Sequence, residues 1–161
     1  DIFADAFRQG GDDPRIHGSR VRVCAIGHRE LLPERVREAI AYAEEKTAHY
    51  DDYRYNIAVA YGGRQEIIQA IRQLAHKVQV GELEPDEIDT EMVSKHLYTG
   101  DLPDPDLILR TSGEERVSNF LLWQLAYSEF YFADVYWPAL RKVDFLRAIR
   151  AYQQRRRRRG L

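Results

Sequence analysis

Cysteine is almost absent from the sequence: Cys24 stands alone among 161 residues. One cysteine cannot form a disulfide within the chain, so packing and hydrogen bonding must hold the fold together. A lone thiol is typical of proteins in a reducing compartment, and we expect a cytoplasmic protein. Cys24 lies in an apolar stretch, which predicts a small buried residue of a strand.

Neither sign of charge dominates the chain. It has 24 Lys and Arg against 26 Asp and Glu, which gives a formal net charge of −2. A dedicated nucleic-acid-binding domain usually carries a basic excess, so we expect no nucleic-acid partner. No apolar run reaches the roughly 18 residues that span a bilayer. The length and the apolar fraction of 44% predict one domain over residues 1–161.

The spacing of apolar residues predicts alternating strands and helices. Strands are predicted at residues 20–26, 55–61, 107–110 and 130–132, the second of them buried on both faces. Helices are predicted at residues 33–47, 64–80, 89–97, 119–127 and 143–152, with a helix end at 1–9 and a loop at 10–14. This order predicts an α/β fold with a largely parallel central sheet flanked by helices.

Two of the predicted helices carry more specific expectations. The helix at 33–47 should bury one apolar face, made of Val36, Ala39, Ile40, Ala43 and Thr47. The short helix at 89–97 should begin at a polar residue whose side chain caps its free N–H groups, either the aspartate or the threonine at 89–90.

Arginines follow the ends of two predicted strands, at Tyr61-Gly-Gly-Arg64 and at Arg110. Ligands of parallel sheets bind at the carboxyl ends of strands. Arg110, Arg116 and Ser118 could therefore converge on one phosphate, helped by the start of a helix at Ser118. An alternative fits the composition equally well: Ser118 is a plain helix cap, and the arginines pair with nearby glutamates on the surface.

Other polar residues leave alternatives open. Glu129 beside a phosphate cluster would need a cation between them, most simply Mg²⁺, but it could also be an ordinary exposed glutamate. The histidines show no metal-type spacing, and no Ser-His-Asp order is present. The arginine run at 155–159 reads as a solvated tail, as a patch for nucleic acid or acidic lipid, or as an arm that reaches a neighbouring subunit.

Taken together, four motifs resemble those of the cis-prenyltransferase family, the undecaprenyl diphosphate synthase-like or Z-isoprenyl diphosphate synthases. They are Tyr61-Gly-Gly-Arg64, the stretch from Arg110 to Glu129, Trp137-Pro138 and Arg158-Arg159-Gly160. The resemblance runs from Val21 to Gly160 and corresponds to the C-terminal two-thirds of the family's domain. It implies that the main catalytic aspartate and most of the tunnel wall belong to an N-terminal section that this sequence lacks, and that this chain alone is inactive.

The resemblance implies cis-prenyl chain elongation, in which isopentenyl diphosphate condenses with an allylic diphosphate primer to give a Z-polyprenyl diphosphate. It implies Mg²⁺ as cofactor, a homodimer, and a lipid product that leaves peripheral membrane association open. The alternative is a non-catalytic partner subunit of a cis-prenyltransferase complex. The resemblance to the family also implies roles for single residues. Arg110, Arg116 and Ser118 would bind isopentenyl diphosphate, Arg64, Arg158 and Gly160 would bind substrate, and Glu129 would bind Mg²⁺.

The chain departs from the family's pattern at two places. Ala60 stands before Tyr61 where many relatives have asparagine, and Glu115 follows Glu114 where some have histidine. Neither departure touches the expected phosphate-binding residues.

Overall fold

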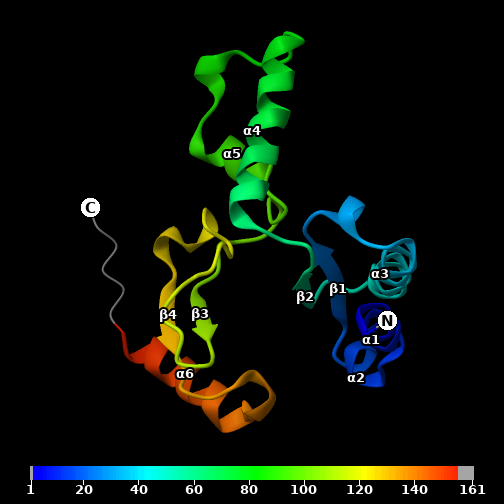
Figure 1. The fold of residues 1–161 in the computed structure, drawn as a ribbon, viewed down its shortest axis with the longest axis vertical. Coiled ribbons are helices and arrows are strands. Elements are labelled where there is room, and N and C mark those ends of the chain that lie inside the picture. The colour runs from blue at the N-terminus through cyan, green and yellow to red at the C-terminus, as the bar shows by residue number, and fades with distance from the viewer. Residues whose placement is uncertain (1, 156–161) are drawn as a thin grey trace. The chain divides into compact units, whose positions relative to one another are not determined.

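The computed structural model describes residues 2–155, which form two compact units that divide between Thr99 and Gly100 (Figure 1). The first unit contains α1 (Ile2–Asp12), α2 (Pro14–Gly18), β1 (Val21–Ile26), η1 (Arg29–Leu31), α3 (Glu34–Thr47), β2 (Tyr53–Ala58), α4 (Gly63–Gln79), η2 (Pro85–Glu87) and α5 (Thr90–Lys95). The second contains β3 (Leu107–Arg110), η3 (Gln124–Tyr127), β4 (Glu129–Phe132), η4 (Trp137–Ala139) and α6 (Lys142–Gln154). The single domain expected from the length stays a prediction.

The strands of both units pair in parallel, which confirms the predicted α/β class. β1 pairs with β2, and β3 pairs with β4, so residues 2–155 contain two separate two-stranded sheets. The predicted strands at 20–26, 107–110 and 130–132 are confirmed, with shifts of one residue at most. The observed pairing therefore places the exits of β1 and β2 at one edge, and those of β3 and β4 at another.

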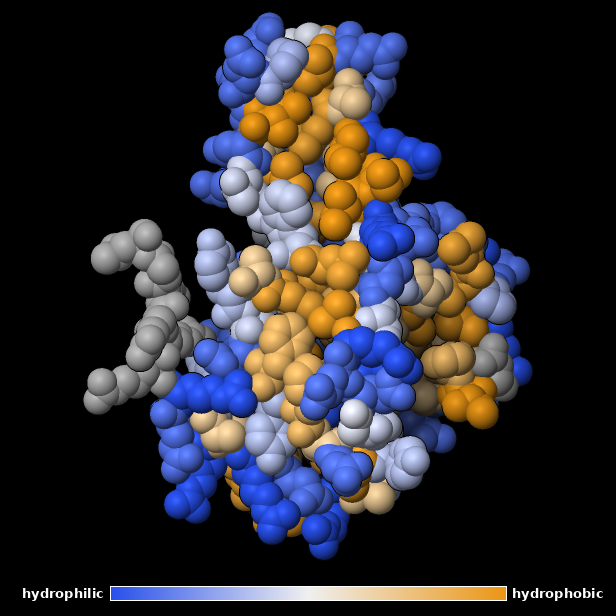
Figure 2. Space-filling view, turned by 60° about the vertical axis from the view of Figure 1, so that its left-hand side comes forward, coloured by the Kyte–Doolittle hydropathy of each residue, from blue (hydrophilic) through white to orange (hydrophobic). Residues whose placement is uncertain are grey.

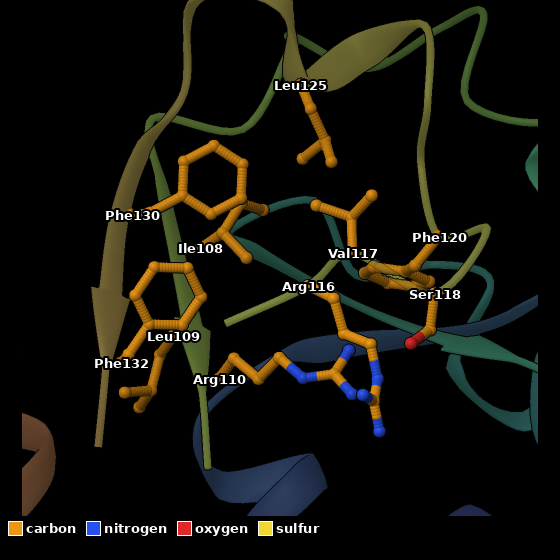
Figure 3. Close-up of a pocket in the computed structure, with 10 residues that line it drawn as sticks. All are labelled: Ile108, Leu109, Arg110, Arg116, Val117, Ser118, Phe120, Leu125, Phe130 and Phe132. Carbon is orange, nitrogen blue, oxygen red and sulfur yellow. The ribbon is translucent and has the colours of Figure 1, made fainter. Parts of the chain in front are cut away.

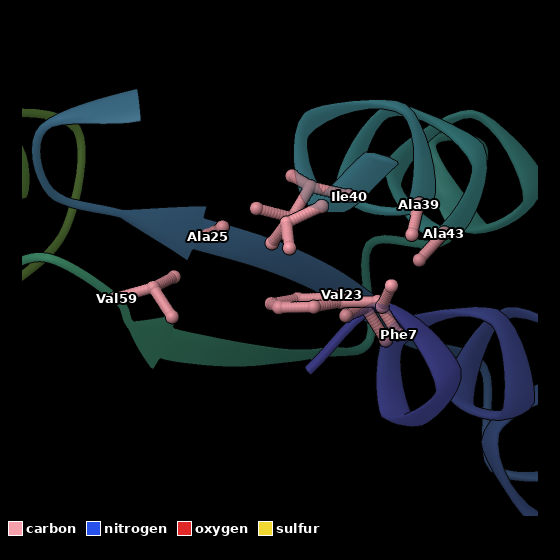
Figure 4. Close-up of a cluster of buried hydrophobic side chains, with 9 residues drawn as sticks. Phe7, Val23, Ala25, Ala39, Ile40, Ala43 and Val59 are labelled. Carbon is pink, nitrogen blue, oxygen red and sulfur yellow. The ribbon is translucent and has the colours of Figure 1, made fainter. Parts of the chain in front are cut away.

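The core of the first unit lies between α1, α3 and β1 (Figure 4). Ile40 of α3 is fully buried, and Phe7 of α1 and Val23 of β1 are buried with it. The predicted apolar face of α3 is confirmed, because all five of its residues are buried. Burying aliphatic and aromatic side chains stabilises the fold by about 1.5–3 kcal/mol each.

Thr47 is the polar member of that buried face. Its hydroxyl accepts a hydrogen bond from the backbone N–H of Val23 (3.0 Å) and donates one to the carbonyl oxygen of Ala43 (2.8 Å). The side chain is fully buried, so both bonds replace contacts with water. Thr47 therefore links the end of α3 to the middle of β1.

The exits of β1 and β2 approach each other very closely. Val59 donates its N–H to the carbonyl oxygen of Ile26 (2.9 Å), and His28 donates its N–H to that of Ala60 (3.2 Å). Gly27 between them has a φ of +129°, and a Cβ at this position would lie 2.0 Å from the carbonyl oxygen of Val59. Only glycine fits where the two chains pass this closely.

Several details of the first unit differ from the prediction, among them Cys24, which is half-buried instead of buried. Residues 10–12 continue α1 instead of forming a loop, because Gly11 lets the helix approach α3: a Cβ there would lie 3.1 Å from the Cα of Ala43. β2 begins two residues earlier and ends three residues earlier than expected, and it is not buried on both faces, since Tyr53 and Tyr55 are 66% and 55% exposed. Within residues 2–155, β1 is its only pairing partner.

The predicted N-cap of α5 is Asp89, whose carboxylate accepts a hydrogen bond from the N–H of Met92 (2.7 Å). α4 ends at Gln79, and Gly81 follows with a φ of +75°, as the predicted stop requires. Apolar side chains also lie at the surface of α4, where Ile68 and Ile71 are about half exposed. Figure 2 shows hydrophobic side chains at the surface of the segment that carries α4 and α5, at the top of the view.

The helix predicted at 119–127 is wrong for most of its length. Ser118, Asn119 and Leu121 have φ values of +46°, +62° and +44°, which the right-handed helix excludes. The chain instead forms turns, followed by the short helix η3. α6 matches its prediction at 143–152, and it ends before Arg155. No helix in the described part of the chain is both long enough and apolar enough to cross a membrane.

We expect Thr47→Val to lower the free energy of unfolding by about 1–3 kcal/mol, because the buried N–H of Val23 would lose its acceptor. Thr47→Ser keeps the hydroxyl and removes one methyl group, so it should cost only about 1 kcal/mol. Chemical denaturation followed by circular dichroism measures both values. Equal stability of the two variants would show that the hydrogen bonds of Thr47 contribute little.

Candidate functional site

A pocket of about 190 Å³ lies in the second unit, where β3, β4 and the loop between them meet (Figure 3). The strands position two of its walls, because Ile108 of β3 lies opposite Phe130 of β4, and Arg110 lies opposite Phe132. Its lining residues are Ile108, Leu109, Arg110, Arg116, Val117, Ser118, Phe120, Leu125, Phe130 and Phe132.

Polar groups occupy one side of this pocket. Figure 3 shows the guanidinium groups of Arg110 and Arg116 beside each other, with the hydroxyl of Ser118 on the same side. The structure thus brings together the three residues that the sequence predicted for one anion. Two neighbouring guanidinium groups repel each other, and a bound phosphate or diphosphate relieves this repulsion with charge-assisted hydrogen bonds.

Apolar groups form the opposite side. The rings of Phe130 and Phe132 stack with their centroids 5.9 Å apart, and Phe120, Val117 and Leu125 complete the wall. A pocket with arginines on one side and phenylalanines on the other suits a ligand with an anionic head and a short hydrocarbon tail.

Backbone hydrogen bonds fix the start of the loop that carries Arg116. Ser112 and Gly113 donate their N–H groups to the carbonyl oxygens of Val135 (2.8 Å) and Ala133 (3.1 Å). Ala133 in turn donates its N–H to the carbonyl oxygen of Arg110 (2.7 Å). The parallel pairing of β3 and β4 thus continues past both strands, which holds the exit of β3 in place.

The two arginines differ in their partners. Arg116 forms an ion pair with Glu114, and both side chains are accessible to solvent. Within residues 2–155, no carboxylate pairs with Arg110. The surface pairing that we considered as an alternative is therefore present at Arg116 alone. Ser118 has a positive φ and begins no helix, so neither a helix cap nor a helix dipole contributes at this residue.

Glu129, the expected metal ligand, forms an ion pair. Its Oε2 accepts a hydrogen bond from Nη1 of Arg155 (2.8 Å), and the same Nη1 donates to the carbonyl oxygen of Phe130 (2.7 Å). Glu129 is held at the start of β4 by its N–H, which donates to the carbonyl oxygen of Asp106 (2.9 Å). Among residues 2–155, no three His, Cys, Asp or Glu side chains are grouped so that they could hold a metal ion.

Arg64 lines a different pocket, of about 310 Å³, in the first unit. This pocket is bordered by His28, Arg64, Gln65, Ile68, Gln69 and Arg72. Arg64 thus lines a pocket of the first unit, and Arg110 and Arg116 line a pocket of the second. Arg158 and Gly160, which were also expected to bind substrate, lie outside the described residues.

The sequence reasoning missed three features of these sites. Phe130 and Phe132 were expected only to form a strand, although their alternation already predicted a shared face. Arg155 was assigned to a tail, and nothing in the sequence pairs it with Glu129. Glu66 is 1% exposed in the first unit, whereas the helical pattern gives no sign that this carboxylate is buried.

Comparison with known proteins identifies the family. The model of the undecaprenyl diphosphate synthase family matches residues 2–160, and the chain belongs to this cis-prenyltransferase family. It is 57% identical over 162 residues to a tritrans,polycis-undecaprenyl-diphosphate synthase (geranylgeranyl-diphosphate specific) of Methanocaldococcus jannaschii. It is 59% identical over 160 residues to the protein of the same name from Methanopyrus kandleri.

These alignments cover 99% of this chain and 58% and 59% of the two archaeal proteins, so the chain spans about three fifths of their length. Among solved structures, lavandulyl diphosphate synthase from Lavandula x intermedia in complex with dimethylallyl diphosphate has a TM-score of 0.92 and 39% identity. That match covers 97% of this chain and 67% of the other.

We expect Glu114→Gln to tighten the binding of inorganic diphosphate to the full-length protein, because the carboxylate competes for Arg116. The gain should reach about fivefold, which corresponds to the ~1 kcal/mol upper range of an exposed ion pair. Isothermal titration calorimetry at constant ionic strength measures it.

Glu115→Gln is the matched control, because it removes the same charge from the exposed neighbouring residue. An equal gain in both variants would mean that net charge alone, and not the pair with Arg116, limits anion binding.

Proposed function

We propose that this chain takes part in cis-prenyl chain elongation, in which isopentenyl diphosphate condenses with an allylic diphosphate primer to give a Z-polyprenyl diphosphate. The observation that carries this proposal is the pocket of Arg110, Arg116 and Ser118, with its facing wall of phenylalanines. Its polarity matches isopentenyl diphosphate, which has a diphosphate head and a five-carbon hydrocarbon tail. The names and identities of the archaeal relatives support the same reaction.

In this proposal the residues of the second unit bind and orient the condensing unit. Arg110 and Arg116 bind its diphosphate through their planar N–H groups, and Ser118 donates its hydroxyl. Phe130 and Phe132 exclude water from the hydrocarbon end. The double bond of the bound molecule is thereby held ready to attack the allylic carbon of the primer, while the C–O bond to the primer's diphosphate breaks and diphosphate leaves. The condensed product then loses a proton to restore a double bond.

Among the described residues, Glu129 is the carboxylate that this proposal assigns to magnesium. Glu129 offers a carboxylate, the ligand type that Mg²⁺ prefers, but Arg155 pairs with it. When bound, Mg²⁺ would neutralise the charge that develops on the leaving diphosphate.

The remaining expectations are part of the same proposal. Arg64 would bind a substrate diphosphate, Arg158 would reach the site of a neighbouring subunit, and Gly160 would let the backbone approach the phosphate. The half-exposed apolar side chains of α4 supply a surface that a second subunit of a homodimer would cover. A cytoplasmic location, with peripheral membrane association through the lipid product, stays a prediction.

The non-catalytic partner subunit is not favoured. A subunit without turnover has no need of the anion pocket, whereas here Arg110, Arg116 and Ser118 line one cavity. A direct experiment decides between the two: the full-length protein is incubated with Mg²⁺, labelled isopentenyl diphosphate and allylic primers of several lengths. Geranylgeranyl diphosphate is the first primer to test, because both archaeal relatives are named as specific for it. Products of increasing length support the synthase, and their absence with every primer contradicts it.

We expect Arg110→Ala and Arg116→Ala to raise KM for isopentenyl diphosphate and to lower kcat/KM in the full-length protein. Losing a charge-assisted contact with the diphosphate costs on the order of 2–4 kcal/mol, or roughly 30–1000-fold in kcat/KM. Arg147→Ala on α6 is the control, because this arginine is also accessible but lines neither pocket. Unchanged kinetics of both pocket variants would refute the site.

Arg155→Met should tighten the binding of Mg²⁺ in the presence of isopentenyl diphosphate, because it removes a cation that competes for Glu129. The pair is partly exposed, so we expect a gain of up to about fivefold and a change in unfolding free energy below ~1 kcal/mol. Calorimetric titration with Mg²⁺ measures the affinity, with Arg147→Met as the control. Weaker binding by the Arg155 variant would show that Arg155 supports the metal site.

A further inference from the structure

Glu66 is a buried carboxylate of the first unit that has no assigned role in the proposed reaction. It lies in the first turn of α4 and is 1% exposed. A buried carboxylate is costly unless hydrogen bonds compensate for the lost water. Its Oε2 accepts a hydrogen bond from the hydroxyl of Tyr61 (2.5 Å), and its Oε1 accepts one from the backbone N–H of Tyr98 (2.8 Å).

Glu66 forms two hydrogen bonds with the Tyr61-Gly-Gly-Arg64 turn, one through its side chain and one through its backbone. The side chain of Glu66 binds Tyr61 at the start of the turn, and its backbone N–H donates to the carbonyl oxygen of Gly62 (2.9 Å). Gly62 and Gly63 are buried, whereas Arg64 is exposed and lines the 310 Å³ pocket. The carboxylate of Glu66 therefore links Tyr61, the first residue of this turn, to the first turn of α4.

The same carboxylate also binds Tyr98, which contacts two of the residues that line this pocket. The Tyr98 hydroxyl donates a hydrogen bond to Gln69, and its ring meets the rings of His28 and Tyr61 edge to face, at 5.8 and 6.2 Å. His28 and Gln69 both line the pocket with Arg64. Burial, with the nearby charges of Glu30 and Glu66, raises the pKa of Tyr98, so its hydroxyl remains a donor at neutral pH.

We propose that Glu66 is a positioning residue, which holds the turn at 61–64 and Tyr98 so that Arg64 and His28 face one anion-binding pocket. The ligand class is a diphosphate, the group common to every substrate and product of the proposed reaction. A role in stability alone does not require a charge, because apolar residues of similar volume often replace buried ionic groups without loss. The inference rests on the proposed function, since it assigns Arg64 to a substrate diphosphate.

The test compares Glu66→Ala, Glu66→Gln, Tyr61→Phe, Arg64→Ala and the double variant of Arg64→Ala with Glu66→Ala, all in the full-length protein. If Glu66 acts through Arg64, Glu66→Ala should lower kcat/KM about tenfold, mainly through KM for one diphosphate substrate. The double variant should then lose no more than about twofold beyond Arg64→Ala alone, because residues that act as a unit are not additive. Glu66→Gln keeps one acceptor for the N–H of Tyr98, and its NH2 group can donate to the hydroxyl oxygen of Tyr61, so this variant should stay within about threefold of wild type.

Thr47→Val is the matched control, since it removes a buried polar group of the same unit away from this pocket. It should lower the unfolding temperature and leave KM unchanged. Tyr61→Phe keeps the ring and removes only one hydrogen bond to Glu66, so it provides a folded variant if Glu66→Ala does not fold. Wild-type kinetics in both Tyr61→Phe and Glu66→Ala, or full additivity in the double variant, overturns the inference.

Hydrogen–deuterium exchange gives a readout that needs no turnover. The amides of residues 62–66 should exchange about tenfold faster in Tyr61→Phe than in wild type, whereas those of β1 should not change. Inorganic diphosphate should slow this exchange in wild type and fail to do so in Arg64→Ala. If the wild-type protein condenses no substrate but these exchange results hold, the proposed function fails and the positioning by Glu66 stands. Unchanged exchange in Tyr61→Phe rejects the positioning role even in an active enzyme.

Discussion

The second unit depends on holding two positive charges side by side. Arg110 and Arg116 reach the same side of one pocket, and their repulsion favours any conformation that separates them. The hydrogen bonds between β3 and β4, continued by those of Ser112, Gly113 and Ala133, keep the exit of β3 in place. The folded conformation of such a site is least stable when the site is empty, and most stable when an anion lies between the arginines. A bound anion would therefore add to the stability of this loop.

Several elements of the fold could be predicted from the sequence, because local residue patterns determine them. The strand at 107–110 follows from a short apolar run, and the buried face of α3 follows from helical apolar spacing. Both patterns depend only on neighbouring residues of the sequence. The spacing of Arg110, Arg116 and Ser118 around one strand exit left both their grouping and surface ion pairs open, and the resemblance to the family favoured the grouping. The parallel pairing followed from the alternation of elements.

The errors have a common physical cause, which is that tertiary contacts override local preference. Residues 119–127 have helical spacing, yet three residues with positive φ turn the chain, and Phe120 and Leu125 line the pocket instead. Gly11 reads as a loop residue, but it keeps α1 close to α3. The pairs of Glu129 with Arg155 and of Glu66 with Tyr98 join residues 26 and 32 positions apart, which no local pattern reports.

The glycine at the exit of β1 has a consequence for how sequence variation in this chain should be interpreted. In a library of all single substitutions, Gly27 would be among the most depleted positions, although it contributes no side chain to either pocket. The depletion would measure how closely two backbones pass, since even one methyl group would push the carbonyl of Val59 away. A map of intolerant positions thus mixes residues that touch a ligand with residues that only leave room for the chain.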